Sequence, residues 1–206
     1  MKTISTLILS AILIGLVSCN TDVVDEAIIE SSTDISTFQK FMLDEINLAR
    51  TNPAVYAESR LKAENESSTD NGSYQYLKNS APVGALSFNN SLNMSSSKYA
   101  LLLADKNLMG HNEDGTPLKR AITVGFTGTS IGENIAASSG DSYNAILNAQ
   151  SAAIGFVRIM IIDEGVNDLG HRLVMLNSKY KTIGIGYVRN TASTYVNYNV
   201  QNFGNQ

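Results

Sequence analysis

The chain has 206 residues, with 15 Lys and Arg against 19 Asp and Glu, a formal net charge of −4 and 43% hydrophobic residues. This length suits one domain with a substantial core. The basic residues are scattered along the chain and form no positive stripe that could neutralise phosphates. The composition therefore excludes nucleic acid as an expected partner.

The first residues are typical of an export signal. Lys2 is the only charge before an apolar run, about 14 residues long, that ends at Val17 and is followed by Ser18 and Cys19. Cys19 is the only cysteine, so it cannot form an internal disulfide, and its setting resembles a bacterial lipobox. We expect residues 1–18 to be a lipoprotein signal peptide and Cys19 to carry lipid that anchors the protein at the bacterial cell envelope, at the outer membrane or cell surface. An ordinary signal peptide cut nearby is the alternative.

Residues 19–35 are predicted to be a flexible tether, because their acidic, Ser- and Thr-rich composition buries little apolar surface. The folded domain is expected over 36–206. Ser36, with Gln39 three residues later, forms a capping-box pattern that predicts a helix start. Pro53 is placed to start a second helix. The first helix should bury one stripe, namely Phe38, Met42, Ile46 and Ala49.

The rest of the chain divides into helical, loop and strand segments. The helix after residue 141 should bury Ile146, Ala153, Val157 and Ile161. The two final segments alternate apolar and polar residues, which predicts adjacent antiparallel strands. In chain order the expected elements are a surface loop over 64–80, a helix over 90–106, a glycine-rich loop over 111–134, a helix over 142–162, and strands over 183–187 and 196–200.

The two histidines of the chain each lie in a compact polar motif. His111 stands in Gly-His-Asn and His171 in Gly-His-Arg, with Glu133 between them in Gly-Glu-Asn. Imidazole and carboxylate are the side chains best suited to hold a divalent metal or to move a proton near neutral pH. A single histidine beside a glycine is commonly only a turn or core residue. The two histidines and Glu133 together, however, predict one shared cleft.

Several motifs occur in the order found in one known family. They are Leu43-Asp44-Glu45-Ile46-Asn47-Leu48-Ala49-Arg50-Thr51-Asn52-Pro53, Gly110-His111-Asn112, Asp114-Gly115, Arg120, Gly132-Glu133-Asn134-Ile135-Ala136, Ile162-Asp163-Glu164-Gly165, Gly170-His171-Arg172 and Ile183-Gly184-Ile185-Gly186-Tyr187. Over residues 36–203 the chain resembles the CAP superfamily, also called the SCP domain. The resemblance implies an α+β fold, a three-layer α-β-α sandwich with a central antiparallel sheet.

The resemblance also implies a cleft lined by two histidines and two acids. It assigns His111 and His171 as ligands of Zn²⁺ or another divalent cation, and Glu133 as one cleft carboxylate. Glu164 is the expected second acid, with the adjacent Asp163 as the alternative. The residues expected to support the cleft are Asn112, Asn134 and Arg172, of which Arg172 is predicted to be a structural ion-pair partner or a donor to backbone carbonyls.

We expect a monomeric, non-enzymatic protein, tethered to the membrane, whose cleft binds a metal, a small lipid or a peptide. The sequence contains no available cysteine and no His-Glu-x-x-His motif. The alternative is a metal-assisted, peptidase-like hydrolase in which Glu133 takes a proton from metal-bound water. A third hypothesis is an interaction module that acts through the Tyr-rich final strands and the 64–80 loop.

Overall fold

The computed structural model describes the backbone of residues 22–206 and the side chains of residues 35–206. The expected signal peptide and Cys19 lie outside the described residues. The elements are α1 (Asp22–Thr51), α2 (Pro53–Tyr56), the π-helical turn η1 (Ala57–Leu61), α3 (Lys62–Glu66), α4 (Ser73–Lys78), β1 (Ser87–Phe88), α5 (Asn90–Lys106), α6 (Pro117–Thr123), β2 (Ile131–Ser138), the 3₁₀ turn η2 (Asp141–Tyr143), α7 (Ala149–Ile162), α8 (Gly170–Met175), β3 (Thr182–Arg189) and β4 (Asn197–Gly204).

The strands form one sheet in the order β1-β3-β4-β2. β4 pairs antiparallel with β3 and with β2, as the alternating final segments predicted, whereas the two-residue β1 pairs parallel with β3. All eight residues of β4 are buried, because it has a strand on each side and helices over both faces. This central strand sets the register of the site, since Asn202 lies opposite Glu133 and Gln201 opposite Asn134.

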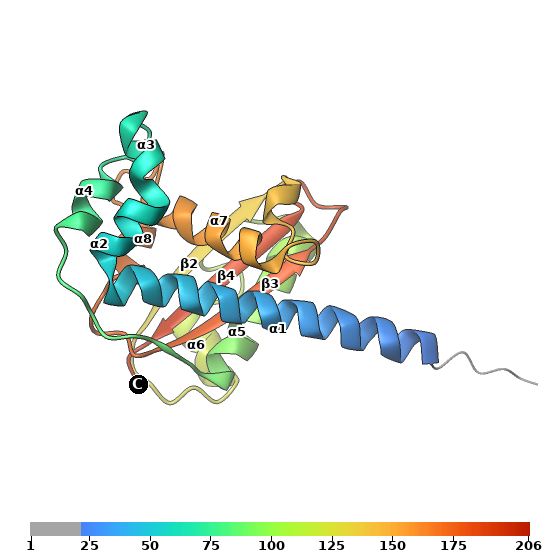
Figure 1. The fold of residues 1–206 in the computed structure, drawn as a ribbon. Coiled ribbons are helices and arrows are strands. Elements are labelled where there is room, and N and C mark those ends of the chain that lie inside the picture. Colours follow the sequence, from blue (N-terminus) through green and yellow to red (C-terminus); the bar gives the residue numbers. More distant parts are fainter. Residues whose placement is uncertain (1–21) are drawn as a thin grey trace, which may run out of the picture.

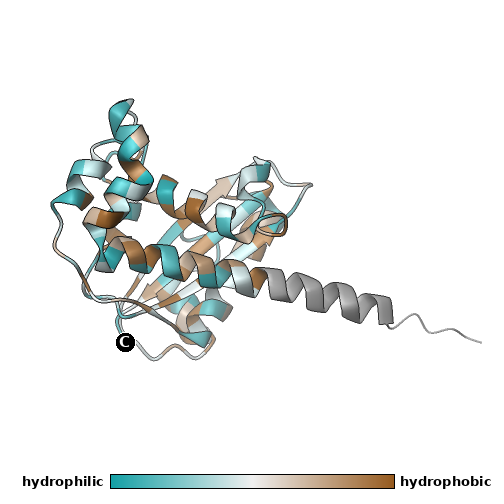
Figure 2. Cartoon of the chain, in the orientation of Figure 1, coloured by the Kyte–Doolittle hydropathy of each residue, from teal (hydrophilic) through white to brown (hydrophobic). Residues whose placement is uncertain are grey.

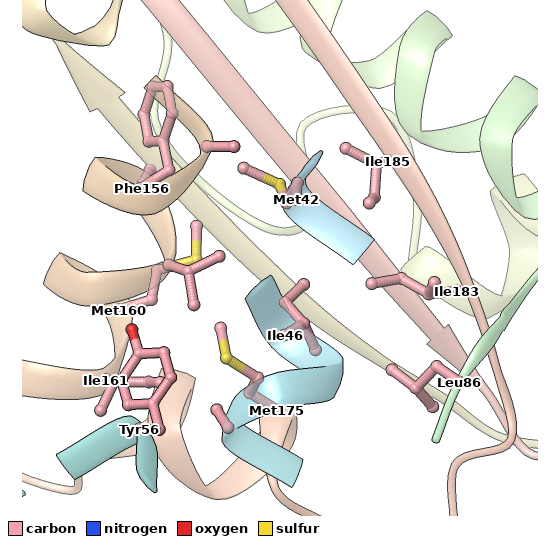
Figure 3. Close-up of a cluster of buried hydrophobic side chains, with 14 of the residues drawn as sticks. Met42, Ile46, Tyr56, Leu86, Phe156, Met160, Ile161, Met175, Ile183 and Ile185 are labelled. Carbon is pink, nitrogen blue, oxygen red and sulfur yellow. The ribbon is translucent and has the colours of Figure 1, made fainter. Parts of the chain in front are cut away.

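The helices cover the sheet from two sides (Figure 1). One core lies between the sheet and the helices α1 and α7, where Ile183 and Ile185 of β3 meet Met42, Ile46 and Phe156 (Figure 3). The second core lies beneath α5 and contains Tyr99, Leu103, Ile135, Tyr198 and Val200. Successive strand residues point to opposite faces. This confirms the predicted three-layer α-β-α sandwich.

The apolar stripe predicted for the first helix is confirmed, since Phe38, Met42, Ile46 and Ala49 have no exposed surface. Figure 2 shows hydrophobic residues recurring along α1 and α7 between hydrophilic ones. α1, however, begins at Asp22, so Ser36 lies inside the helix and does not start it. None of the helices in the described part of the chain is both long enough and apolar enough to cross a bilayer.

The polar 64–80 segment is not an open surface loop. It contains α4, which buries Tyr74 and Leu77. The predicted helix over 142–162 starts late, because the Asn148 side chain caps α7 by accepting from Ser151 N at 2.9 Å. Ile146 therefore precedes the helix and is exposed instead of buried.

The glycine-rich segment over 111–134 also contains regular structure. Thr116 caps α6, with Pro117 in its first turn, and β2 begins at Ile131. Glu133 and Asn134 are consequently strand residues and are held in fixed positions by β4. Neighbouring strand residues face opposite sides of the sheet, so these two side chains serve different parts of the site.

Candidate functional site

The first histidine pairs with the glutamate of β2. His111 Nδ1 lies 3.0 Å from Glu133 Oε1, and the His111 side chain is 49% exposed whereas that of Glu133 is 1% exposed. A carboxylate only accepts hydrogen bonds, so the neutral ring carries its proton on Nδ1. The lone pair of His111 is then on Nε2, the nitrogen that is available to a ligand.

Arg120 of α6 fixes this pair from behind. Its Nη2 donates to Glu133 Oε2 at 2.5 Å, and its Nη1 donates to the carbonyl oxygens of His111, at 2.9 Å, and Gly115. The guanidinium also lies 3.4 Å from the ring centroid of Tyr99. A buried carboxylate needs such a partner, because an unpaired charge away from water is costly.

Tyr99 of α5 holds the loop that carries His111. The Tyr99 hydroxyl donates to Gly110 O at 2.7 Å and accepts from Glu113 N at 3.1 Å, so it bonds the backbone on both sides of the histidine. Burial raises the pKa of Tyr99, which keeps the hydroxyl protonated and able to donate. α5 thus positions the imidazole through one side chain of its inner face.

The second histidine pairs with an aspartate. His171 Nδ1 at the start of α8 lies 2.6 Å from Asp163 Oδ1, and Asp163 Oδ2 accepts from Arg172 N at 2.9 Å. The side chain of Asp163 is fully buried, and that of His171 is 25% exposed. The expected Glu164 is wrong for this role: it is exposed and lies with Arg158 in a separate surface hollow. Asp163 is the acid that meets the histidine, because it caps α7 in a left-handed conformation.

Arg172 is a donor to backbone carbonyls, as predicted. Its side chain donates to Ile161 O at 2.6 Å, to Ile162 O at 2.9 Å and to Asn71 O at 3.3 Å. Burial lowers its pKa. The side chain of Asn71 in turn donates to the carbonyl of Asp163 at 3.0 Å. The segment that was expected to be a surface loop therefore supports the Asp163–His171 pair.

The expected supporting asparagines differ in role. Asn134 Nδ2 donates to His171 O at 3.1 Å, so β2 contacts both histidine segments through adjacent residues. Asn112 is exposed, and within residues 35–206 its side chain makes no hydrogen bond. Its expected supporting role is not seen.

The donor set does not make a complete metal centre. Within the described part of the chain, no three His, Cys, Asp or Glu side chains lie together in an arrangement that could hold a metal ion. Both carboxylates are already taken up by a histidine and by Arg120 or the Arg172 amide. Catalytic zinc sites use three protein ligands, and only the two imidazole Nε2 atoms remain here. The two imidazoles are thus one ligand short of such a site, and the described residues do not by themselves complete the expected Zn²⁺ site.

Replacing each of the two neighbouring acids, Asp163 and Glu164, by its amide tests which one pairs with His171. We expect Asp163→Asn to lower the free energy of unfolding by about 2 kcal/mol, because the new amide group must turn a donor toward Arg172 N or His171 Nδ1. Nitrogen NMR of the ring should then show His171 losing its single tautomer. Glu164→Gln is the matched control and should change neither quantity. Equal effects of the two substitutions would contradict the assignment.

Comparison with known proteins identifies the family of the chain. The model of the CAP cysteine-rich secretory protein family matches residues 43–203. Among solved structures, an extracellular protein containing an SCP domain from Bacillus anthracis str. Ames is 21% identical with a TM-score of 0.45; the match covers 60% of this chain and 35% of that one. An outer surface protein from Borrelia burgdorferi is 16% identical with a TM-score of 0.47, covering 70% of this chain and 94% of that one. No curated protein matches significantly.

The chain thus spans about a third of the length of the Bacillus protein that it resembles (35%). The family model, in contrast, covers most of this chain, including both histidines and the acids that pair with them. The chain belongs to the CAP, or cysteine-rich secretory protein, family.

Proposed function

We propose that the protein is an exported, lipid-anchored CAP-domain protein that binds a peptide-like ligand at its two imidazoles without chemical turnover. One observation carries this proposal. Each histidine has its Nδ1 against a buried carboxylate, which leaves Nε2 of both rings oriented and unused. A fixed tautomer gives a binding surface directional acceptors at low entropic cost.

The surroundings of the two rings favour an amphipathic ligand. Met109, two residues before His111 in the same loop, is 45% exposed. Tyr76, 41% exposed, lies over Arg172, the neighbour of His171. A peptide could place its amide groups on the imidazoles and apolar side chains on these residues. Aromatic and Met side chains at a surface with directional polar groups are typical of recognition sites.

The arrangement gives less support to the hydrolase alternative. Nucleophilic catalysis requires a nucleophile within hydrogen-bond reach of its base. Within residues 35–206 the imidazole nitrogens are hydrogen-bonded to Glu133 and Asp163, and to no Ser or Thr hydroxyl. Glu133 is also held by Arg120, so both of its carboxylate oxygens already have hydrogen-bond partners. Both acids orient the rings.

A peptide array probed with the purified protein tests the proposal. We expect a set of short peptides to bind, and the double variant His111→Ala with His171→Ala to weaken that binding at least tenfold. Lys106→Ala, an exposed change away from both rings, is the control and should bind as the wild type does. Undiminished binding by the double variant, or cleavage of the bound peptides detected by mass spectrometry, would overturn the proposal.

Three further measurements test the remaining parts of the proposal. Calorimetric titration with Zn²⁺ should show no tight one-to-one binding; a tight site that is lost in the double variant would show that the imidazoles hold an ion after all. If the protein binds lipids and does not bind peptides, the ligand of the two imidazoles is a lipid. The anchor is tested by the mass of the amino terminus of membrane-extracted protein, which should be an acylated Cys19.

A further inference from the structure

A pocket of about 310 Å³ lies between α5 and α6, and Arg120 is one of its lining residues. Its walls include Lys98 and Tyr99 of α5, and Lys119 and Arg120 of α6. None of its lining residues is one of the two histidines or their paired acids. The volume is at the lower end of the range of about 300–1,000 Å³ for small-molecule sites. The pocket therefore suits a compact ligand.

The pocket is basic, although the chain carries a net charge of −4. Lys98 and Lys119 are exposed at its walls, and within residues 35–206 neither makes an ion pair, unlike Lys40 and Lys78. Asp114 is the one acid among the lining residues. The charge of Arg120 is balanced by Glu133. Two unpaired ammonium groups facing one carboxylate favour an anion over a cation.

Polar groups are also buried in the pocket wall. Arg120 is only 9% exposed, and its Nε has no hydrogen-bond partner within residues 35–206. Ser95, 2% exposed, accepts from Asn202 Nδ2 at 3.3 Å, so its hydroxyl proton can still be donated. Buried polar groups are normally hydrogen-bonded, so the unpartnered Arg120 Nε is unusual; it has almost no accessible surface, and a ligand reaches it only when the side chain shifts. A ligand with several acceptor oxygens would complement this wall.

Local structure holds the basic groups in place. Gly115 has a φ of +82°, and the aliphatic stem of Lys119 passes over it, where a Cβ would lie 3.4 Å from Lys119 Cδ. The Arg120 guanidinium is stacked on Tyr99 and tied to the His111 carbonyl. Arg120 therefore both lines the pocket and supports the His111–Glu133 pair.

We infer that this pocket binds a small oxyanion, a carboxylate or a phosphate, and that Arg120 transmits its occupancy to His111. Oxyanions match the available groups: ammonium and hydroxyl donors surround a space that is large enough for the head of such a ligand. An anion that draws the guanidinium toward the pocket changes its hydrogen bonds to Glu133 and to the His111 backbone. This inference does not depend on the peptide-binding proposal, because none of the pocket residues touches the imidazole Nε2 atoms.

The two histidines make the inference measurable. The Cε1-bound protons of His111 and His171 give one NMR signal each, and the His111→Gln variant assigns them. We expect titration of the purified protein with inorganic phosphate to shift the His111 signal saturably and to leave the His171 signal nearly unchanged. Acetate is the second arm; dianionic phosphate should bind at least threefold more tightly, and the reverse order would identify a carboxylate ligand.

Matched double variants separate a site from general electrostatics. Lys98→Ala with Lys119→Ala should weaken phosphate binding at least tenfold, whereas Lys62→Ala with Lys106→Ala, which removes two exposed lysines outside the pocket, should leave it within twofold. No saturation with either anion, or equal weakening in both double variants, overturns the site. Saturable binding that moves neither histidine signal overturns the role of Arg120. If the variant with both Lys98→Ala and Lys119→Ala still binds peptides, the oxyanion pocket and the peptide site are separate.

Discussion

Gly186→Ala is expected to lower the free energy of unfolding by about 3 kcal/mol or more, the upper range for overpacking a core. The side of β3 that faces α5 has glycine at 184 and 186, and a Cβ at either position would lie closer than 3.0 Å to backbone atoms of the helix. The clash at Gly186 is with Ser96 and Ser97, and main chain cannot rotate away as a side chain can. α5 would have to move off the sheet.

Such a displacement should also affect the site. α5 carries Tyr99, whose hydroxyl holds the loop on both sides of His111. We therefore expect amide hydrogen exchange in residues 110–113 to become faster in Gly186→Ala. Urea unfolding gives the stability, and Gly84→Ala is the control, because a Cβ there meets nothing within 4 Å. Equal unfolding midpoints for the two variants would contradict the close approach of α5 to β3.

The sequence predicted those elements whose apolar residues recur with a clear period. The helix expected over 90–106 has the bounds of α5, and the alternation in the final segments gave the antiparallel pair of β3 and β4. β2 was missed because its first half, Ile131 to Asn134, has one apolar residue followed by a glycine and two polar residues, and so shows no alternation. Its strand conformation comes from pairing with β4, a contact between residues about 70 positions apart.

For the site, the sequence and the family resemblance identified the histidines and Glu133 but chose the wrong second acid. Asp163 and Glu164 are adjacent, and only the left-handed conformation of Asp163, with a φ of 55°, decides which carboxylate turns toward His171. Tyr99 and Asn71 were not predicted as site residues. The side chain of each one bonds to a backbone carbonyl of another segment, and the sequence gives no signal for such a contact. Arg120 was among the residues that carry the family resemblance. Its role, however, is to hold Glu133, and Glu133 lies on β2, the strand that was not predicted.

Arg50→Ala is expected to cost at least about 4 kcal/mol in the free energy of unfolding, comparable to breaking a buried network of charged hydrogen bonds. Arg50, in the last turn of α1, is 1% exposed, and burial lowers its pKa to about 10. Its guanidinium donates to four carbonyl oxygens, those of Gly84 at 2.9 Å, Met175 at 2.6 Å, Asn177 at 3.1 Å and Tyr180 at 3.2 Å. Alanine would leave these acceptors without their donor.

The four carbonyls belong to three segments that this side chain ties together: the stretch before β1, the end of α8, and the connection into β3. Met175 ends α8, and His171 lies in the first turn of this helix, so loss of Arg50 should loosen His171 as well. Urea unfolding measures the loss. Arg50→Lys should recover part of it, because an ammonium has three donors but not the planar geometry that reaches four acceptors. Lys40→Ala, which removes an exposed ion pair with Asp44, should change stability by no more than about 0.5 kcal/mol. A loss in Arg50→Ala as small as that in Lys40→Ala would show that water replaces the guanidinium and that α1 is held by its apolar face alone.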